Sequence, residues 1–245
     1  VHFPFMSTAQ AIDKLNEHLG IANVAEFRSG PGNLTQVVLR THGHEAHVFL
    51  HGAHVSHFQP AGHDPVLFMS QRSKFEDGQP VRGGVPICFP WFANKADNPS
   101  APSHGFARTR AWKVRSLTQQ PDGSVRIALG LDWSPRTKEL WPYAFAITHT
   151  VTLSDTLTMQ LDVTNHGQEP FVFEEALHTY FAVSDVREVT VTGLRGATYI
   201  DKVDAGRRKS LDEDAIRFAG ETDSAFPTTK ATCVIHDPGM SRRIT

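Results

Sequence analysis

The sequence predicts an all-β protein, a large antiparallel β-sandwich that follows a short N-terminal helix. Two observations lead to this class. Short runs rich in Val, Ile, Phe and Thr recur along the 245 residues, and turn sequences such as Pro121-Asp122-Gly123 and Asn165-His166-Gly167 separate them. In addition, 40% of the residues are hydrophobic, including 16 Phe and 4 Trp, so the chain can bury a substantial core. We therefore expect about ten strands and few helices.

The first element is the helix. Ser7 and Thr8 can cap it, apolar residues such as Ile12 and Leu15 recur at helical spacing, and Gly20 ends it. Beyond the helix no shift in composition divides the chain. We therefore expect an N-terminal arm and helix over residues 1–20 and a single β-sandwich domain over 21–245.

The remaining elements are expected where β-branched and aromatic residues cluster between turns. The expected strands are 34–40, 47–50, 54–58, 66–69, 125–131, 145–153, 157–163, 171–181, 188–192 and 231–235. One short helical turn is expected at 134–140.

Charge and cysteine content exclude several classes of protein. The net charge is −2 and the pI is about 6.7, so the sequence predicts no nucleic-acid surface. Cys88 and Cys233 are too few for a disulfide framework and fit a reducing compartment. No run of 18 apolar residues predicts a membrane span, and the first residues lack the form of a secretory signal. We expect a soluble cytoplasmic protein without membrane or nucleic-acid partners.

Two cationic blocks are candidates for ligand binding. Arg82 is followed by Gly83-Gly84-Val85-Pro86, and Arg108 closes the run His104-Gly105-Phe106-Ala107-Arg108. Guanidinium groups suit oxyanions, aromatic faces suit a sugar ring, and glycines allow close approach of a ligand. The alternative is that both arginines are surface cations and that His104 is a solvated loop residue. For Trp91, Phe92 and Phe106, simple core filling is the favoured interpretation.

A third block places a second histidine on a predicted strand. In an extended segment Glu174, Ala176, His178 and Tyr180 lie on one face. Such a face carries two ionisable groups and a phenol, which is unusual for a protein core. A half-exposed polar sheet surface is the alternative.

Seven histidines between His42 and His63 raise the question of a metal site. His51, His54 and His57 are three apart, but the residues between them favour a strand, on which His51 and His57 would share a face and His54 would not. No ligand spacing is complete. We expect strand histidines and no metal.

Together these blocks resemble the galactose mutarotase-like superfamily, and most closely its glucose-6-phosphate 1-epimerase branch. The motifs are Pro80–Pro86 with Phe89-Pro90, His104–Arg108, Leu177-His178-Thr179-Tyr180-Phe181 and, more weakly, Gly220–Asp223. The resemblance implies a β-sandwich that holds a sugar phosphate and interconverts its α and β anomers without metal or organic cofactor.

The resemblance also implies residue roles. His178 is the catalytic histidine, and Arg82, His104, Arg108 and Asp223 bind the substrate. A histidine that titrates near neutrality suits proton donation to the ring oxygen.

The resemblance further places a proton-abstracting Glu near the C-terminus, after a Trp-Asn-Pro segment. Neither occurs up to Thr245, so we expect the natural protein to be longer and its base to lie beyond residue 245. Glu174 is a poor substitute, because four residues of strand place it roughly 13 Å from His178. Ser103 also departs from the family pattern, in which some relatives have a longer amide.

Two other functions remain open. The chain could be a mutarotase for free sugars, in which the arginines bind hydroxyl groups. It could also be a non-catalytic carbohydrate-binding sandwich, an interpretation that the missing C-terminal Glu favours.

Overall fold

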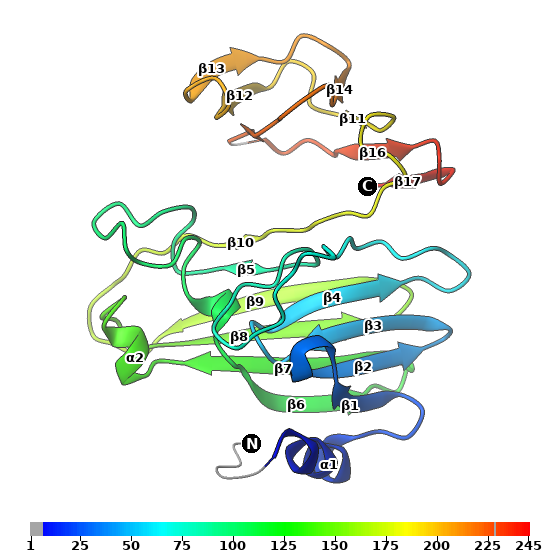
Figure 1. Ribbon diagram of the computed structural model, residues 1–245, viewed down its shortest axis with the longest axis vertical. Helices are drawn as coiled ribbons and strands as arrows, with labels where there is room; N and C mark the ends of the chain where they lie inside the picture. Colours follow the sequence, from blue (N-terminus) through cyan, green and yellow to red (C-terminus); the bar gives the residue numbers. More distant parts are fainter. Residues whose placement is uncertain (1–6, 228) are drawn as a thin grey trace. The chain divides into compact units, whose positions relative to one another are not determined.

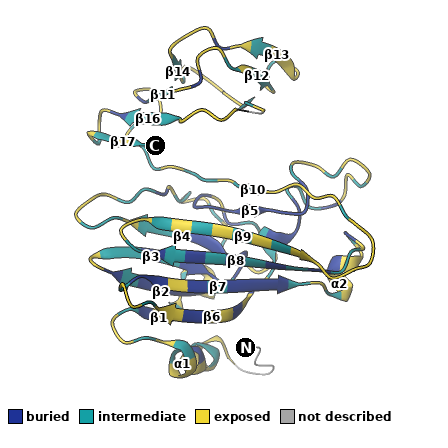
Figure 2. Ribbon diagram, turned by 180° about the vertical axis from the view of Figure 1, so that it is seen from behind, coloured by how far each residue is buried: buried dark blue, intermediate teal, exposed yellow. Residues whose placement is uncertain are grey.

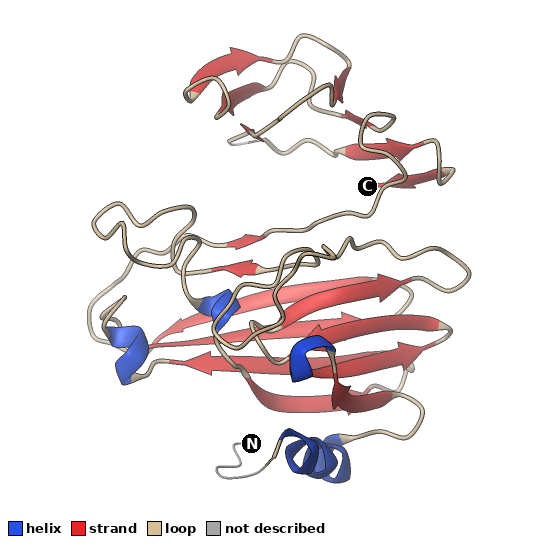
Figure 3. Cartoon of the chain, in the orientation of Figure 1, coloured by secondary structure: helices blue, strands red, loops and turns tan. Residues whose placement is uncertain are grey.

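The computed structural model describes residues 7–227 and 229–245, and the chain divides into two compact units, Val1–Ala182 and Val183–Thr245 (Figure 1). Strands dominate in both units and helices are few (Figure 3). The all-β class is therefore confirmed. The arm expected before the first helix lies outside the described residues, and a single domain over 21–245 stays a prediction that this division does not test.

The predicted N-terminal helix is confirmed as α1 (Thr8–Leu19). Ser7 caps it through a capping box with Gln10, in which each side chain accepts from the backbone N–H of the other residue. Gly20 ends it and donates its N–H to a carbonyl of the last turn. Leu15 is the buried residue of the apolar stripe.

The first sheet of the first unit has the order β1-β2-β3-β4, and all neighbours are antiparallel. Asn16 of α1 lies at the edge of this sheet. Its side-chain amide donates to the Phe27 carbonyl at 2.7 Å and accepts from the Phe27 N–H at 2.7 Å, as a neighbouring strand would. The strands are β1 (Ala25–Ser29), β2 (Thr35–Thr41), β3 (His44–Phe49) and β4 (His54–Gln59), and the short helix η1 (Pro31–Asn33) joins the first two.

The second sheet has the order β6-β7-β8-β9 and is also antiparallel. Along β8 buried and half-buried residues alternate without exception, because every second side chain points inward. The strands are β6 (Lys113–Gln119), β7 (Val125–Asp132), β8 (Phe145–Leu153) and β9 (Leu157–Asn165). The helical turn expected at 134–140 is confirmed as α2 (Pro135–Lys138), which Ser134 caps.

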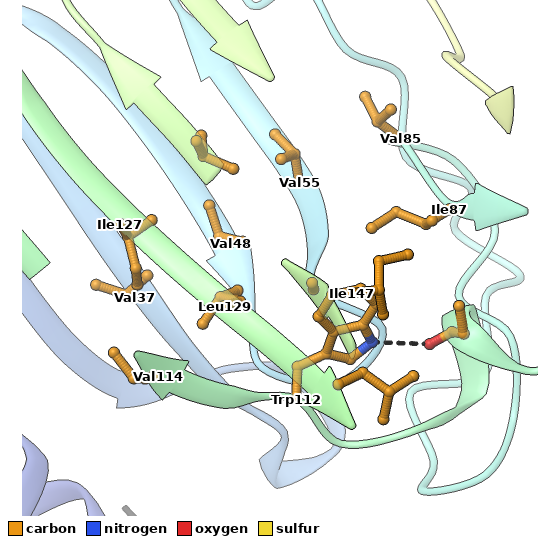
Figure 4. Packing of buried hydrophobic residues seen from close by; sticks show 14 of the residues in the cluster. Val37, Val48, Val55, Val85, Ile87, Trp112, Val114, Ile127, Leu129 and Ile147 are labelled. Carbon is orange, nitrogen blue, oxygen red and sulfur yellow. Dashed lines mark hydrogen bonds between the residues drawn. The ribbon is translucent and has the colours of Figure 1, made fainter. Parts of the chain in front are cut away.

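The inner faces of these two sheets form the core, and the two sheets lie as two layers in Figure 1. Dark blue along β2 and β7 in Figure 2 marks the buried strands of each sheet. Figure 4 shows Val37, Val48 and Val55 of one sheet packed with Ile127 and Leu129 of the other. Each such side chain contributes about 1.5–3 kcal/mol when it is fully buried. The core therefore holds the sandwich together.

Two predicted strands are not continuous. Only β10 (Ala176–Leu177) forms within 171–181, and it pairs with β5 (Ile87–Cys88). Proline has no N–H, so Pro86 and Pro90 accept from the facing segment without donating in return, and the pairing stays short. The segment 66–69 makes only single bridges, to Phe181 and to Gly83.

Two edge strands, β1 and β6, were not predicted. In β6 the register shifts between Val114 and Ser116, and the buried residues are Val114 and Leu117. This bulge breaks the two-residue period on which strand prediction depends. In β1 only Ala25 and Phe27 are buried, so the apolar signal is short.

The second unit consists of two small antiparallel sheets, with orders β14-β11-β16-β17 and β13-β12-β15. The predicted strands 188–192 and 231–235 correspond to β11 and β16, while the other five were missed because they are short and polar. The strands are β11 (Thr190–Thr192), β12 (Thr198–Asp201), β13 (Arg207–Ser210), β14 (Ala215–Arg217), β15 (Ser224–Ala225), β16 (Val234–Asp237) and β17 (Arg242–Ile244).

None of the helices in the described part of the chain combines the length and apolar character that a membrane span requires. Cys88 and Cys233 are both free thiols. The cytoplasmic location stays a prediction.

Candidate functional site

The candidate site is assembled on the backbone of residues 82–92. Gly83 pairs with Met69. Val85 pairs with Val55 of β4 and donates its N–H to the Val55 carbonyl at 2.8 Å. A Cβ on Gly84 would lie 2.3 Å from that same carbonyl oxygen, so only glycine fits at this position. Pairing with Met69 and with Val55 of β4 therefore fixes one side of this segment.

The histidine-bearing segment lies along the same backbone. Glu174, His178 and Tyr180 donate their N–H groups to the carbonyls of Pro90, Pro86 and Gly84, at 3.0, 3.1 and 2.9 Å. Their spacing of two residues or four places their side chains on a common face, as the sequence predicts. The pairing carries His178 to the middle of residues 82–92.

The second cationic block also attaches to this backbone. The Phe89 carbonyl accepts from Phe106 and Ala107 at 3.0 and 3.2 Å, and the Phe89 N–H donates to the His104 carbonyl at 3.3 Å. Gly105 has φ +74°, and a Cβ there would lie 1.9 Å from the Phe89 oxygen. No other residue fits without moving the main chain, so Gly105 fixes the approach of His104.

The His104 ring is oriented by a hairpin-like contact with Ala93. The Ala93 N–H donates to Nδ1 of His104 at 3.1 Å, and the His104 N–H donates to the Ala93 carbonyl at 2.7 Å. Because Nδ1 accepts this hydrogen bond, it carries no proton, and the proton of the neutral ring is on Nε2. His104 can therefore donate a hydrogen bond from Nε2.

Aromatic rings connect the two histidines. The centroids of His104 and His178 are 6.3 Å apart. The Phe92 ring centroid lies 4.7 Å from that of His104 and 6.5 Å from that of His178, on which the ring is stacked. The Tyr180 ring centroid lies 5.0 Å from that of His178. His178 is exposed, whereas His104, Phe92 and Tyr180 are half-buried. The group forms an open surface of two imidazoles and two aromatic rings.

Arg108 lies near Tyr180 of this group and near Arg82, and the two arginines supply positive charge. Burial lowers the pKa of Arg108, and the charge of Arg82 lowers it further. Nη2 of Arg108 donates to the Ser103 carbonyl at 2.7 Å, while its Nε is buried without a hydrogen-bond partner. Within residues 7–227 and 229–245, neither arginine forms an ion pair with a carboxylate. This pair of cations can bind an anion.

The remaining aromatic residues of the motifs belong to the core. Trp91 is 7% exposed and Phe106 is fully buried, and their rings pack at 5.9 Å. Core filling, the favoured interpretation, is therefore correct for these two residues. Phe92 alone of the three lies beside the histidines.

Asp223 is the one predicted site residue in the second unit. It is exposed, and its carboxylate lies 3.6 Å from Nζ of Lys202. The structure thus brings together His178, Arg82, His104 and Arg108, and the place of Asp223 beside them stays a prediction.

The sequence did not reveal the role of Glu174. Its carboxylate Oε2 accepts from the Phe92 N–H at 2.8 Å, which ties the 171–181 segment to the turn that carries Phe92 and Ala93. The shared face of Glu174 and His178 was the available signal. The donor that Glu174 contacts, the Phe92 N–H, depends on the fold of residues 89–93 and could not be predicted from that face.

The histidine-rich segment adopts strands, as expected, but its faces were wrongly assigned. His47 lies in β3, and His54 and His57 lie in β4. His51 is not part of β4, because positive φ at Gly52 and Ala53 turns the chain between them. His54 is fully buried directly beneath Gly84, and burial lowers its pKa to about 3, so it is neutral.

The sequence profile of the aldose 1-epimerase family matches residues 35–245, which is most of the chain. The chain belongs to the aldose 1-epimerase family. The match includes all residues of the candidate site, so the three motifs that meet on residues 82–92 belong to the part of the chain that defines membership.

Within the aldose 1-epimerase family, named relatives agree with the predicted branch. The chain is 36% identical over 195 residues to a protein of Escherichia coli K12 named "Putative glucose-6-phosphate 1-epimerase", covering 80% of this chain and 64% of the relative. A protein of the same name from Cenchrus ciliaris is 32% identical over 222 residues, covering 87% and 67%. The chain thus spans just under two thirds of the length of the bacterial relative.

A solved structure of the family has the same fold. A crystal structure described as "a putative mutarotase" from Salmonella typhimurium matches with a TM-score of 0.84 and 32% identity, covering 92% of this chain and 74% of that one. The mutarotase-like sandwich predicted from the sequence is therefore confirmed.

Proposed function

We propose that this protein is a hexose-6-phosphate 1-epimerase that interconverts the α and β anomers of a sugar such as glucose 6-phosphate. The observation that carries the proposal is the meeting of two imidazoles, 6.3 Å apart, with two arginines that lack carboxylate partners among the described residues. Family membership and the names of the relatives support the same activity.

The reaction requires two proton transfers. A base takes the proton of the anomeric hydroxyl, the bond from the anomeric carbon to the ring oxygen breaks, and that oxygen receives a proton. The open-chain aldehyde rotates about its bond to C2, and the ring oxygen then attacks its other face while the protons return. Atoms and electrons balance without an oxidant or reductant, and the reaction is an isomerisation.

Each residue of the site has a role in this scheme. His178, exposed and central, donates the proton to the ring oxygen. Nε2–H of His104 stabilises the negative charge that develops on this oxygen, because the Ala93 contact orients it as a donor. Arg82 and Arg108 bind the phosphate through charge-assisted hydrogen bonds.

The proposal is tested by anomer exchange in the natural protein, measured by NMR saturation transfer between the two anomers of glucose 6-phosphate. His178→Gln is expected to lower kcat about 10²- to 10⁴-fold, as the loss of a general acid does. Arg136→Gln, a change at an exposed arginine of α2, is the matched surface control and should leave exchange unchanged. An unaltered protein that fails to accelerate exchange for any hexose phosphate would end the proposal.

The preference for phosphate is tested separately with Arg82→Gln. The variant loses the charge-assisted hydrogen bonds of one guanidinium group to the phosphate, which contribute about 1.5–3 kcal/mol of binding free energy. KM for glucose 6-phosphate is therefore expected to rise about 10- to 100-fold, while exchange of free glucose stays unchanged. Equal losses on both sugars would instead support a mutarotase for free sugars. Sugar binding by calorimetry without any exchange would support the carbohydrate-binding alternative.

A further inference from the structure

A second group of titratable side chains lies on strands β3 and β4, apart from the motifs assembled on residues 82–92. Glu45 and His47 are two residues apart on β3, and His57 of β4 is the direct cross-strand partner of His47. The His47 and His57 ring centroids are 4.6 Å apart. One ligand atom from each of the three residues lies within 4.8 Å of the others. We call this group the β3–β4 site.

The sheet determines which way the group faces. Ala46 and Val48, which alternate with Glu45 and His47, are fully buried in the core of the sandwich. Successive strand residues point to opposite faces, so the β3–β4 site lies on the outer face of the sheet. Its three side chains are half-buried, which leaves them accessible while the strands hold them in place.

The donor atoms match a particular class of ion. Two imidazole nitrogens and one carboxylate oxygen are the protein ligands of many zinc sites that keep a further position for water. Imidazole favours Zn²⁺, Ni²⁺ and Cu²⁺, whereas Mg²⁺ and Ca²⁺ favour all-oxygen sites. The chemistry therefore points to a divalent transition metal.

The neighbouring contacts show what the ion would replace. Oε1 of Glu45 is 2.8 Å from Nε2 of His47, and Oε2 of Glu45 accepts from Nε of Arg40 at 2.7 Å. Arg40 thereby orients the carboxylate and leaves Oε1 directed at the histidine. A metal ion between Oε1 and Nε2 would take the place of the proton that they share, and its binding would release that proton.

One contact opposes binding. Nη2 of Arg28 lies 3.4 Å from Nε2 of His47, so a cation would have to displace a guanidinium. This repulsion weakens the site and gives it a specific signature, because removal of Arg28 should strengthen metal binding. A group of histidines that bound metal unspecifically would not respond in this way.

We propose that Glu45, His47 and His57 bind one divalent transition-metal ion of the Zn²⁺ class on the outer face of β3 and β4. The ion joins the two strands next to the register shift between His47 and Val48. The proposal does not depend on the epimerase activity, and its failure would leave that activity untouched.

The test is equilibrium dialysis of the intact protein against ZnCl₂, with thermal unfolding as a second readout. We expect saturable binding of one ion per chain and a rise in Tm with Zn²⁺, because a ligand that binds only the folded state stabilises it. His57→Gln should weaken binding at least about tenfold, and Arg28→Gln should strengthen it. A folded His57→Gln protein, shown by an unchanged Tm without metal, makes the comparison valid; should it unfold, Glu45→Gln takes its place.

The matched control is His42→Gln. His42 is exposed, belongs to the same histidine-rich segment, and lies 3.8 Å from Asp155. Its substitution should leave Zn²⁺ binding unchanged. Absence of saturable binding, equal binding by His57→Gln, loss of binding in His42→Gln, or weaker binding by Arg28→Gln would each overturn the proposal.

Discussion

The two units of the chain are built from the same kind of element, short antiparallel strands, but they stabilise it differently. All of the largest fully buried side chains, among them Phe27, Phe89 and Phe145, belong to Val1–Ala182. Among the described residues of Val183–Thr245, only Val189, Leu194 and Leu211 are buried hydrophobic residues.

The second unit relies instead on polar contacts. Asp237 is 1% exposed and accepts from the N–H groups of Ser184 and Met240 at 2.9 and 3.2 Å. Burial raises the pKa of Asp237, but hydrogen bonds from Ser184 outweigh it, so the net shift is downward. Lys209 bridges Asp201 and Asp204 at 2.8 Å each. The comparison teaches that apolar burial sustains one unit, and that a few buried or bridged carboxylates organise the other.

The largest effect is expected from Phe145→Ala. The Phe145 ring is 1% exposed and packs against Phe89, Phe106 and Trp141, so its loss leaves a cavity and should lower the free energy of unfolding by about 3–5 kcal/mol. Urea unfolding followed by tryptophan fluorescence measures this, because all four Trp residues belong to the first unit.

The control for the cavity is Val172→Ala. Val172 is 88% exposed, so this change should stay within about 0.5 kcal/mol. Similar losses in both variants would contradict a stability that depends on the buried core.

The second effect concerns pH and tests the buried histidines of the first unit. Burial lowers the pKa of His54 to about 3 and that of His149 to about 4, below the ordinary value of 6.5. Between pH 7 and pH 5 the unfolded chain takes up protons that the folded chain does not. Stability is therefore present above pH 6.5 and falls as the pH decreases, by about 2 kcal/mol for each histidine at pH 5.

Urea unfolding at the two pH values checks this expectation. His149→Asn, which can keep a donor to the Ala53 carbonyl that His149 contacts at 3.1 Å, should show a smaller loss between pH 7 and pH 5. A free energy of unfolding that does not change over this range would show that the histidines are not excluded from water.

The smallest effect is expected from Asp237→Asn in the second unit. The amide cannot accept all the hydrogen bonds that the carboxylate accepts, so the local free energy of opening should fall by about 1–2 kcal/mol. Hydrogen exchange at the Ser184 and Met240 amides should accelerate, while the fluorescence-detected unfolding of the first unit stays unchanged. A shift of both by the same amount would mean that the two units unfold as one.

Regular elements could be predicted from the sequence, because local periodicity determines them. The bounds of β8 match the expected 145–153, and Ser7 and Gly20 delimit α1 as expected. The edge strands β1 and β6 escaped prediction because half of each faces solvent and a bulge interrupts β6. The single bridges of 66–69 depend on partners far away in the sequence.

The sequence indicated which residues belong to the candidate site better than it indicated how the fold brings them together. The resemblance of their motifs to a known family indicated His104 and His178, and the alternation around His178 indicated its face. The pairing of His47 with His57 could not be predicted, because it depends on the register of β3 against β4, which a turn and a bulge determine. Likewise, nothing local indicates that the Phe89 carbonyl receives the second cationic block.

The attachment of three distant segments to residues 82–92 rests almost entirely on amide and carbonyl groups. Such bonds are indifferent to the identity of most side chains, so the frame can persist while the groups that contact a ligand diverge. Gly84 and Gly105 are exceptions, since the main chain itself occupies the space of a methyl group. A scaffold of this kind permits new specificities to arise by side-chain exchange, provided that these glycines stay in place.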